Sequence, residues 1–236
     1  MMNADTLREQ LRQTAVQQGA KAFGVADLDM LRRTTPDLLC NIPGTYTRAV
    51  VFGMRLQRAV LDSIQSEPTP LYVHNYRQLN YQLDRAAWCV ADQIQDAGGA
   101  AVAVAASQIV QSVPMTGHVS HKLLGWAAGL GHIGRSTLLV HPAFGAQMRY
   151  ASVLTDLPLP PDRPVERSCG TCRQCRDMCP AAAIGEAPGD FNLMACYRKL
   201  NTEFVHVSFV GQHVCGVCLK ACPGAGVKEA CGANED

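Results

Sequence analysis

The sequence predicts an α/β protein in which a larger domain with a mixed sheet, residues 1–157, precedes a small cysteine-rich domain, residues 158–236. Three observations support this division. A strand, a long helix and a second strand follow one another between residues 48 and 105, as in a βαβ unit. A proline-rich stretch, residues 157–164, can be neither helix nor central strand. Eight of the 11 cysteines lie beyond it, between Cys169 and Cys222.

The elements of the larger domain follow from the spacing of its apolar residues. Apolar residues at helical spacing predict helices over residues 5–18, 73–96 and 119–128. Short apolar runs bounded by turn residues predict strands over residues 22–26, 48–54, 100–105, 137–141 and 148–157. The run 100–105 alternates Ala and Val, which is too apolar for an exposed element and predicts a central strand.

Composition argues against several classes of protein. The net charge is +1 and Lys and Arg form no run, so the basic stripe of a dedicated nucleic-acid binder is missing, although RNA as a substrate stays open. No apolar stretch reaches the roughly 18 residues of a transmembrane helix. The first 20 residues contain no apolar segment of the kind found in secretory signals. We therefore expect a cytoplasmic protein that does not enter a membrane.

The cysteines follow the pattern of two [4Fe–4S] clusters. The first run is C-x2-C-x2-C-x3-C-P and the second is C-x2-C-x3-C-P, with one more cysteine between them. In two-cluster ferredoxins the fourth cysteine of such a run binds the other cluster. The sequence therefore predicts a bacterial ferredoxin-like module with crossed ligand sets. Cluster I is expected on Cys169, Cys172, Cys175 and Cys222, and cluster II on Cys179, Cys196, Cys215 and Cys218.

Two other uses of these cysteines fit the pattern less well. Disulfides need an oxidising compartment, and zinc prefers separate sets of four ligands with longer gaps between the cysteine pairs. Cys40, Cys89 and Cys231 lie outside the pattern and are predicted to be free thiols without a role.

A glycine-rich segment, residues 129–134, satisfies the G-x-G-x-x-G string of dinucleotide-binding folds. That fingerprint requires a strand before the glycines and a helix after them. Here the predicted order is reversed, which favours a glycine helix cap followed by a tight turn. A cap does not explain the third glycine or the three hydrogen-bond donors that follow it, Arg135, Ser136 and Thr137.

Three segments resemble epoxyqueuosine reductases. Residues 126–139, which contain the glycine segment, are similar to the A-G-L-G-x-x-G-K-x-x-L-L segment of that family. Residues 154–160, Leu-Thr-Asp-Leu-Pro-Leu-Pro, resemble its TDL-x-LPP strand exit, and the residues around Cys169, Cys172 and Cys196 resemble its cluster module. The resemblance covers about residues 20–223 and is shared in outline with corrinoid-dependent reductive dehalogenases.

The resemblance implies a nitroreductase-like, corrinoid-binding fold for the larger domain, with cobalamin bound base-off near one cluster. Electrons from ferredoxin or flavodoxin would pass through both clusters to cobalt. The family's glycine turn makes the following the expected cofactor-binding residues: Gly129, Gly131, Gly134, Arg135, Ser136 and Thr137. The D-x-H-x-x-G string of proteins that bind cobalt through a histidine is missing, so His132 is expected to line a turn or a pocket.

The chain departs from this family at the expected proton donor. Epoxyqueuosine reductases carry an Asp three residues before a Pro, where this chain has Gln111, and an amide cannot deliver a proton as a carboxylic acid does. The chain also ends 14 residues after Cys222, whereas tRNA-modifying members often continue into a helical repeat region. The sequence does not choose among the other candidate donors, which are Tyr76, Tyr150, His118 and His121. The two histidines are expected on one helix face, or at a solvated helix start.

Three functions therefore stand as hypotheses. The first is a cobalamin-dependent iron–sulfur reductase that acts on something other than epoxyqueuosine in tRNA, with a small molecule or a corrinoid protein as the acceptor. The second is an electron-transfer or activating protein for a corrinoid partner protein, because electron transfer alone needs no general acid. The third is an authentic epoxyqueuosine reductase with a relocated acid.

Overall fold

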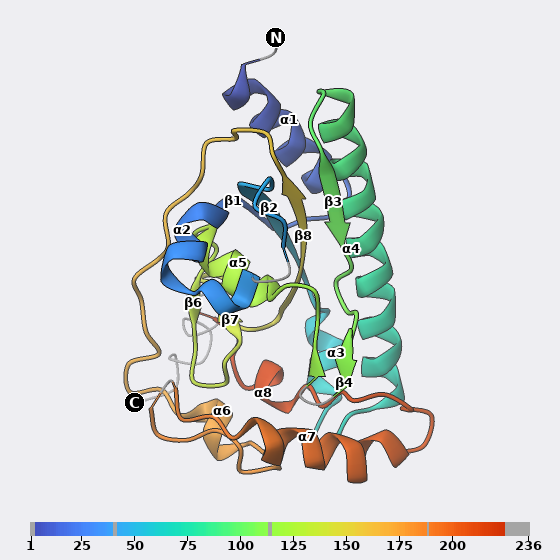
Figure 1. Cartoon of the computed structure of the whole chain (residues 1–236). Coiled ribbons are helices and arrows are strands. Elements are labelled where there is room, and N and C mark those ends of the chain that lie inside the picture. The colour runs from blue at the N-terminus through green and yellow to red at the C-terminus, as the bar shows by residue number, and fades with distance from the viewer. Residues whose placement is uncertain (1–2, 40–41, 113–114, 188, 225–236) are drawn as a thin grey trace, which may run out of the picture. The chain divides into compact units, whose positions relative to one another are not determined.

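The computed structural model describes residues 3–39, 42–112, 115–187 and 189–224 (Figure 1). The chain divides into two compact units, each assembled from three separate stretches. Unit 1 consists of Met1–Met54, Leu79–Leu130 and Arg149–Val165, and unit 2 consists of Arg55–Gln78, Gly131–Met148 and Glu166–Asp236. The sequence predicted two domains, residues 1–157 and 158–236, that fold independently. The two compact units do not test independent folding, so this domain boundary stays a prediction.

Unit 1 contains a four-stranded sheet in the order β1-β2-β8-β3. Its strands are β1 (Ala22–Asp27), β2 (Arg48–Arg55), β3 (Ala101–Val104) and β8 (Met148–Thr155). β1 pairs with β2, and β3 with β8, in antiparallel register. The backbone N–H of Thr47 donates to Thr155 and that of Leu56 to Gln147, so β2 and β8 also run antiparallel. The α/β class is confirmed, but neighbouring strands in this sheet are all antiparallel rather than mixed.

The helices of unit 1 cover both faces of this sheet. They are α1 (Ala4–Gln17), α2 (Leu28–Thr34), the 3₁₀ helix η1 (Pro36–Leu39), α4 (Pro70–Asp96, from Leu79 onward) and α5 (His121–Ala127). Leu11 of α1 and Leu83 of α4 share an apolar core with Val25 of β1. The adjacent Gly24 faces the other way, since a Cβ there would lie 2.3 Å from the carbonyl oxygen of Ala128, just after α5. A hairpin of β4 (Gln111–Ser112) and β5 (Met115–Thr116) completes the described elements of unit 1.

Two predictions about strands are wrong in an informative way. β2, α4 and β3 follow one another as expected, but β8 lies between the two strands, so they are not neighbours. β3 is consequently an edge strand beside α4 (Figure 1), and Val102 is 39% exposed rather than central. The predicted strand 137–141 shrinks to β7 (Leu139–Val140), which pairs with β6 (His132–Ile133) in a separate sheet of unit 2. Position within a sheet depends on distant partners, which an apolar pattern does not reveal.

Unit 2 combines the β6–β7 hairpin with short helices. They are α3 (Arg58–Asp62), α6 (Gln174–Asp177), α7 (Leu193–Thr202), the 3₁₀ helix η2 (Phe204–His206) and α8 (Val217–Lys220). The cysteine-rich segment carries α6, α7 and α8, drawn in orange and red in Figure 1. One of its apolar clusters joins Ile184, Ala221 and Phe191 to three cysteines, Cys175, Cys179 and Cys218. Thiols therefore occupy positions that apolar side chains would fill in an ordinary core.

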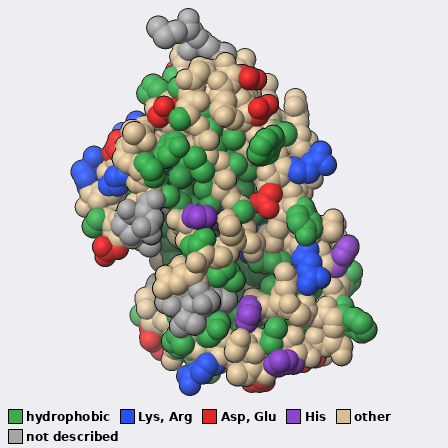
Figure 2. All heavy atoms as spheres, turned by 45° about the vertical axis from the view of Figure 1, so that its right-hand side comes forward, with side chains coloured by type: hydrophobic (Ala, Val, Ile, Leu, Met, Phe, Trp, Pro, Cys, Tyr) green, Lys and Arg blue, Asp and Glu red, His purple; other side chains and the backbone are tan. Residues whose placement is uncertain are grey.

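No helix of the described residues is long and apolar enough to cross a lipid bilayer. On the face shown in Figure 2, positive and negative side chains are scattered and form no basic stripe.

Candidate metal centre

The eight cysteines of the two runs all lie in unit 2. Three of them are carried by short helices: Cys175 by α6, Cys196 by α7 and Cys218 by α8. Asn192 caps α7 by accepting a 2.9 Å hydrogen bond from the backbone N–H of Ala195, which fixes the helix start at Leu193, three residues before Cys196.

The thiols of the predicted cluster I set influence one another. Burial raises the pKa of Cys222 to about 11, and the nearby Cys169, Cys175 and Cys172 add to the rise. Burial likewise raises the pKa of Cys175, with further contributions from Cys169 and Cys172. The structure thus brings Cys222, from the second cysteine run, to three cysteines of the first.

The predicted cluster II set behaves in the same way. Burial raises the pKa of Cys215 to about 11, and Cys196 and Cys179 add to it. Burial also raises the pKa of Cys218, with contributions led by Cys215, Cys196 and Cys179 and a smaller one from Cys175. Cys179, from the first run, therefore lies with the cysteines of the second run.

Eight thiols in two groups of four match the number of ligands that two [4Fe–4S] cubes require. Within the described residues, no three His, Cys, Asp or Glu side chains converge on a point where one metal ion could be held. A [4Fe–4S] cube does not require such convergence, because its four thiolates each bind a different iron and stand apart around it. A cysteine binds metal as a thiolate, so metal binding releases the thiol proton. Buried cysteines with a raised pKa would therefore be thiolates when the metal is bound and protonated thiols when it is not. The donor set fits two cubes, and the assignment of the eight ligands stays a prediction.

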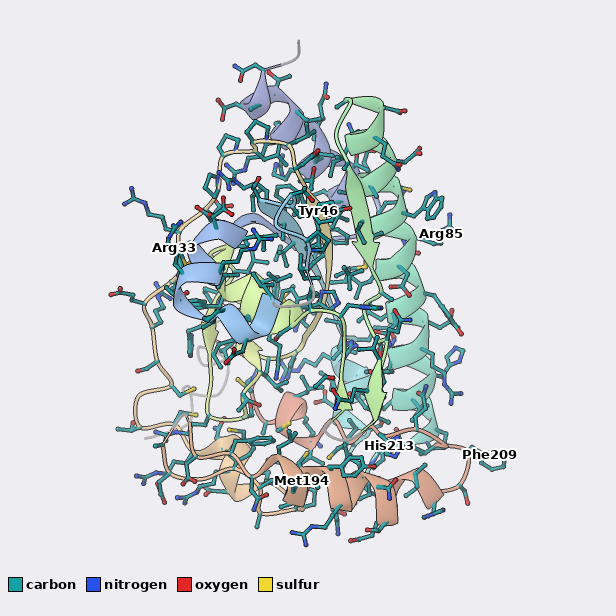
Figure 3. All side chains as sticks on the ribbon, in the orientation of Figure 1. Arg33, Tyr46, Arg85, Met194, Phe209 and His213 are labelled. Atoms are coloured by element: carbon teal, nitrogen blue, oxygen red, sulfur yellow. The ribbon has the colours of Figure 1, made fainter. Side chains whose placement is uncertain are left out.

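Side-chain contacts hold the second cysteine run against α7. The Nε2 atom of His213 lies 3.0 Å from Oδ1 of Asn201, and the His213 ring stacks on Tyr197 with centroids 6.0 Å apart. His213 is two residues from Cys215, and Tyr197 is next to Cys196, so these contacts hold two predicted cluster II ligands in place. Figure 3 labels His213 near α7 and shows Phe209 of the intervening loop pointing away from the chain, 89% exposed.

The first glycine of the segment 129–134 is a helix cap, as one of the two interpretations predicted. The backbone N–H of Gly129 donates to Trp126 at 3.0 Å and that of Leu130 to Gly125 at 2.9 Å, which is the hydrogen-bond pattern of a Schellman motif. Gly129 has a φ of +73°, the left-handed conformation that such a cap requires. α5 precedes the glycines and β6 follows them, which excludes the dinucleotide-binding arrangement.

The other two glycines make room inside the β6–β7 hairpin of unit 2. A Cβ at Gly131 would lie 2.2 Å from the carbonyl oxygen of Val140. A Cβ at Gly134 would lie 2.7 Å from Cγ2 of Val140 and 3.2 Å from the sulfur of Cys169. These contacts explain both glycines through packing of the chain on itself and on a predicted cluster ligand.

Arg135 ties the same hairpin to the first cysteine loop. Its side chain is 7% exposed, and its Nε and Nη2 atoms donate to the carbonyl oxygens of Cys172 at 2.9 Å and Gly170 at 2.7 Å. Ser136 is buried beside it, and Thr137 has a φ of +58°, which is unusual for a residue with a side chain. Two N–H donors of Arg135 are thus bonded to the backbone of this chain. Contact of Arg135, Ser136 and Thr137 with a corrinoid stays a prediction.

His132 lies beside a predicted cluster ligand, a contact that the sequence did not suggest. Its Nε2 atom is 3.7 Å from the sulfur of Cys169. Partial burial lowers the pKa of His132, and the neighbouring Arg167 lowers it further, so the ring is neutral at neutral pH. The two residues are 37 positions apart in sequence, and only the folded hairpin brings them together.

Two of the candidate proton donors, His118 and His121, line a pocket of unit 1. The pocket has a volume of about 180 Å³ and is lined by residues 104–109, 116–119 and 121. Ala106 of the lining is fixed by two hydrogen bonds of its backbone. Its N–H donates to Oδ1 of Asp84 at 2.8 Å, and its carbonyl accepts from Nη2 of Arg149 at 3.0 Å. No Asp or Glu is among the described residues that line the pocket.

The predicted placement of the two histidines is wrong. Ser120 caps α5, so the helix begins at His121, and His118 lies before it rather than on the same helix face. His121 is buried rather than solvated: its Nδ1 lies 2.8 Å from Oγ of Ser152 and its Nε2 lies 3.0 Å from the carbonyl oxygen of Ala105. A carbonyl only accepts, so Nε2 carries the proton and the Ser152 hydroxyl donates to Nδ1. Burial lowers the pKa of His121, which holds the ring neutral.

Tyr76 lies half-buried on α4 in unit 2, and is not among the residues that line this pocket. The three other candidates are placed as follows. His118 is exposed and lines the pocket. Tyr150 of β8 is 7% exposed, and burial raises its pKa above the usual range, which disfavours release of its proton. Gln111 lies exposed in the short β4–β5 hairpin, paired with Thr116. His118 is therefore the exposed histidine among the residues that line this pocket.

A His121→Gln variant is expected to be less stable than the wild type by about 1–3 kcal/mol at pH 8, because a buried hydrogen bond is left unmade. The folded-state pKa of His121 lies below 6.5, so the unfolded chain takes up the proton first as the pH falls. The contribution of His121 is thus fully present well above pH 6.5 and is lost below it. Urea unfolding at pH 8 and pH 5.5 should show the difference between the two proteins shrinking. A difference that does not change with pH would contradict a buried neutral ring.

Comparison with known proteins gives a consistent set of relatives, although no family model matches the chain. Epoxyqueuosine reductase from Bacillus cereus is 26% identical over 227 residues, which are 91% of this chain and 57% of that protein. Tetrachloroethene reductive dehalogenase from Sulfurospirillum multivorans is 33% identical over 108 residues, 41% of this chain and 22% of that protein. The chain thus spans little more than half the length of the Bacillus relative.

Solved structures show the same two groups at the level of the fold. A reductive dehalogenase described as suggesting a mechanism for B12-dependent dehalogenation superposes with a TM-score of 0.71 at 19% identity, covering 91% of this chain and 31% of that one. Epoxyqueuosine reductase with an epoxyqueuosine-modified tRNA stem loop superposes with a TM-score of 0.62 at 19% identity, covering 94% of this chain and 66% of that one. The chain therefore resembles epoxyqueuosine reductases in sequence and shares its fold with solved epoxyqueuosine reductases and reductive dehalogenases, as its glycine segment and cysteine module predicted.

Proposed function

We propose that this chain is an iron–sulfur reductase that holds two [4Fe–4S] clusters on crossed ligand sets and passes electrons through them to a cobalamin. The observation that carries the proposal is the grouping of the eight thiols, in which Cys222 joins the first run and Cys179 joins the second. The likeness to a B12-dependent dehalogenase and to epoxyqueuosine reductases supports the cobalamin. The electron donor would be a ferredoxin or a flavodoxin.

The residues of the chain would position the clusters rather than perform bond chemistry themselves. Cobalamin, when bound, supplies a metal centre that can transfer electrons to a substrate. Arg135 holds the carbonyl oxygens of Cys172 and Gly170 and so fixes the first cysteine loop. The stacked pair of Tyr197 and His213 does the same for the second run. Fixed loops keep the cluster surroundings constant during electron transfer, which is how a protein sets a reduction potential.

The substrate is proposed to be a small molecule other than epoxyqueuosine in tRNA. Gln111 stands where the family has its acidic proton donor, and the pocket of unit 1 has no Asp or Glu among its described lining residues. His121 and Tyr150 are both held in the form that does not release a proton easily. A reduction that needs a proton would draw it from the exposed His118 or from water.

Metal analysis tests the proposal directly. Protein purified without oxygen should contain about eight irons per chain, as two cubes require, and should show [4Fe–4S] signals in electron paramagnetic resonance after reduction. Added cobalamin should bind and change its absorption spectrum. Iron far below eight per chain after reconstitution, or the lack of any cobalamin spectral change, would refute the proposal.

An electron-transfer protein for a corrinoid partner is the second candidate, and the same lack of an acid in the pocket favours it. It predicts about eight irons per chain and oxidation of the clusters only when the partner is added. Reduction of a substrate by the isolated, cobalamin-loaded chain with a chemical reductant would exclude it. Restoration of queuosine in tRNA of a strain lacking epoxyqueuosine reductase would instead support an authentic enzyme of that kind.

A further inference from the structure

We infer that Nε2 of His132 donates a hydrogen bond to the sulfur of Cys169 and thereby raises the reduction potential of cluster I. The inference rests on the proposed function, since it requires cluster I to be bound. It assigns to His132 a positioning and tuning role.

The geometry supports a directed contact. The Nε2 atom lies 3.7 Å from the sulfur of Cys169. A thiolate that binds iron has only lone pairs to offer, so the ring nitrogen must be the donor. His132 sits in β6, paired with Val140 of β7, so the backbone that carries the ring is held in a hairpin.

Two further contacts hold that hairpin against the loop of Cys169. Gly134 lies so close that a Cβ would be 3.2 Å from the same sulfur. The buried Arg135 donates to the carbonyl oxygens of Gly170 and Cys172, on either side of the loop. The ring and the sulfur are therefore kept together by the packing around them, and the contact does not depend on the histidine alone.

The direction of the effect follows from electrostatics. Reduction places one more electron on the cluster and its thiolate ligands, and no bond is made or broken. An N–H group pointing at a ligand sulfur stabilises this added negative charge, and hydrogen bonds to the sulfurs are among the factors that set cluster potentials. Loss of the donor should make cluster I harder to reduce.

The test is a potentiometric titration of the reconstituted protein, followed by electron paramagnetic resonance, on two variants and a control. His132→Phe keeps a ring of similar size and removes the donor, whereas His132→Gln retains an N–H group. His206→Ala serves as the control, because this exposed histidine lies in the same unit on η2. Iron content and far-UV circular dichroism show whether each variant keeps its clusters and its fold.

We expect one of the two reduction steps to move to a lower potential in His132→Phe, to return toward the wild-type value in His132→Gln, and to stay unchanged in His206→Ala. An unchanged potential in a His132→Phe protein with full iron content would overturn the inference while leaving the proposed function intact. An equal shift of both steps would also overturn it, because a local hydrogen bond acts on one cluster. A wild-type protein without iron would refute the proposed function itself.

Discussion

Replacing Cys222 with alanine is expected to remove cluster I, the cluster on the first cysteine run, and to leave cluster II in place. Cys222 belongs to the second run by sequence, yet its thiol is grouped with Cys169, Cys172 and Cys175. A cube that has lost one of four thiolates is not held stably, so the iron content should fall from about eight to about four per chain. The measurement is iron analysis of the folded, reconstituted variant, with absorption at visible wavelengths as a second measure of cluster content.

Double variants separate the crossed arrangement from an uncrossed one. If the ligands cross, Cys222→Ala with Cys169→Ala removes two ligands of one cluster, and about four irons remain. Cys222→Ala with Cys218→Ala then removes one ligand from each cluster, and almost no iron remains. In an uncrossed arrangement Cys222 and Cys218 would bind the same cluster and Cys169 the other. The first double variant would then lose almost all its iron, and the second would keep about four irons.

Cys89 provides the control for cysteine loss in general. It lies on α4, outside the two runs, and is a free thiol in unit 1. Cys89→Ala should therefore keep about eight irons per chain. A loss of iron in this variant would show that the iron content of the others does not report on ligand loss alone.

The crossed ligand sets were predicted from the two-cluster ferredoxin pattern, in which the fourth cysteine of a run binds the other cluster. The structure brings Cys222 near the first run, and the assignment of the eight ligands stays a prediction. The helix cap at Gly129 could be predicted from a local signal, since a glycine just after a helical pattern satisfies the last turn. Ser120 was also a local signal: as a preferred cap residue it marks the start of α5, and it would have placed His118 outside the helix.

Features that depend on distant residues could not be predicted in this way. The alternating Ala and Val of β3 do not show that β8, far later in the chain, takes the central place in the sheet. Arg135 was expected to serve a ligand, but its partners are carbonyl oxygens 35 and 37 residues further along. The hydrogen-bond partners of His121 are likewise Ser152 and Ala105, neither of which is close to it in sequence.

Gly145 is another residue whose importance only the structure reveals, because the sequence marks it as no more than a turn. Gly145 has a φ of +58°, and a Cβ there would lie 2.1 Å from the carbonyl oxygen of Cys222 and 2.4 Å from the nitrogen of Gly224. Both neighbours are backbone atoms, so they cannot move aside as a flexible side chain would. The next residue, Ala146, donates its N–H to the same Cys222 carbonyl at 3.0 Å, so this turn sets the position of a predicted cluster ligand.

Gly145→Ala is therefore expected to destabilise unit 2 and to loosen cluster I. A left-handed conformation costs a residue with a Cβ about 1–2 kcal/mol, and overpacking adds about 1–3 kcal/mol. The free energy of unfolding of the reconstituted protein should fall by the sum of the two, and cluster I should be lost faster than cluster II in the presence of an iron chelator.

Gly211→Ala separates the two contributions. Gly211 lies in the same unit with a φ of +54°, and a Cβ there would meet nothing within 4 Å. This variant should show only the cost of the left-handed conformation, about 1–2 kcal/mol, with both clusters retained. If Gly145→Ala and Gly211→Ala lose equal stability and keep equal iron, the contact between Gly145 and Cys222 has no part in holding cluster I. A larger loss confined to Gly145→Ala, together with early release of about four irons, would tie this turn to the cluster through the carbonyl of Cys222.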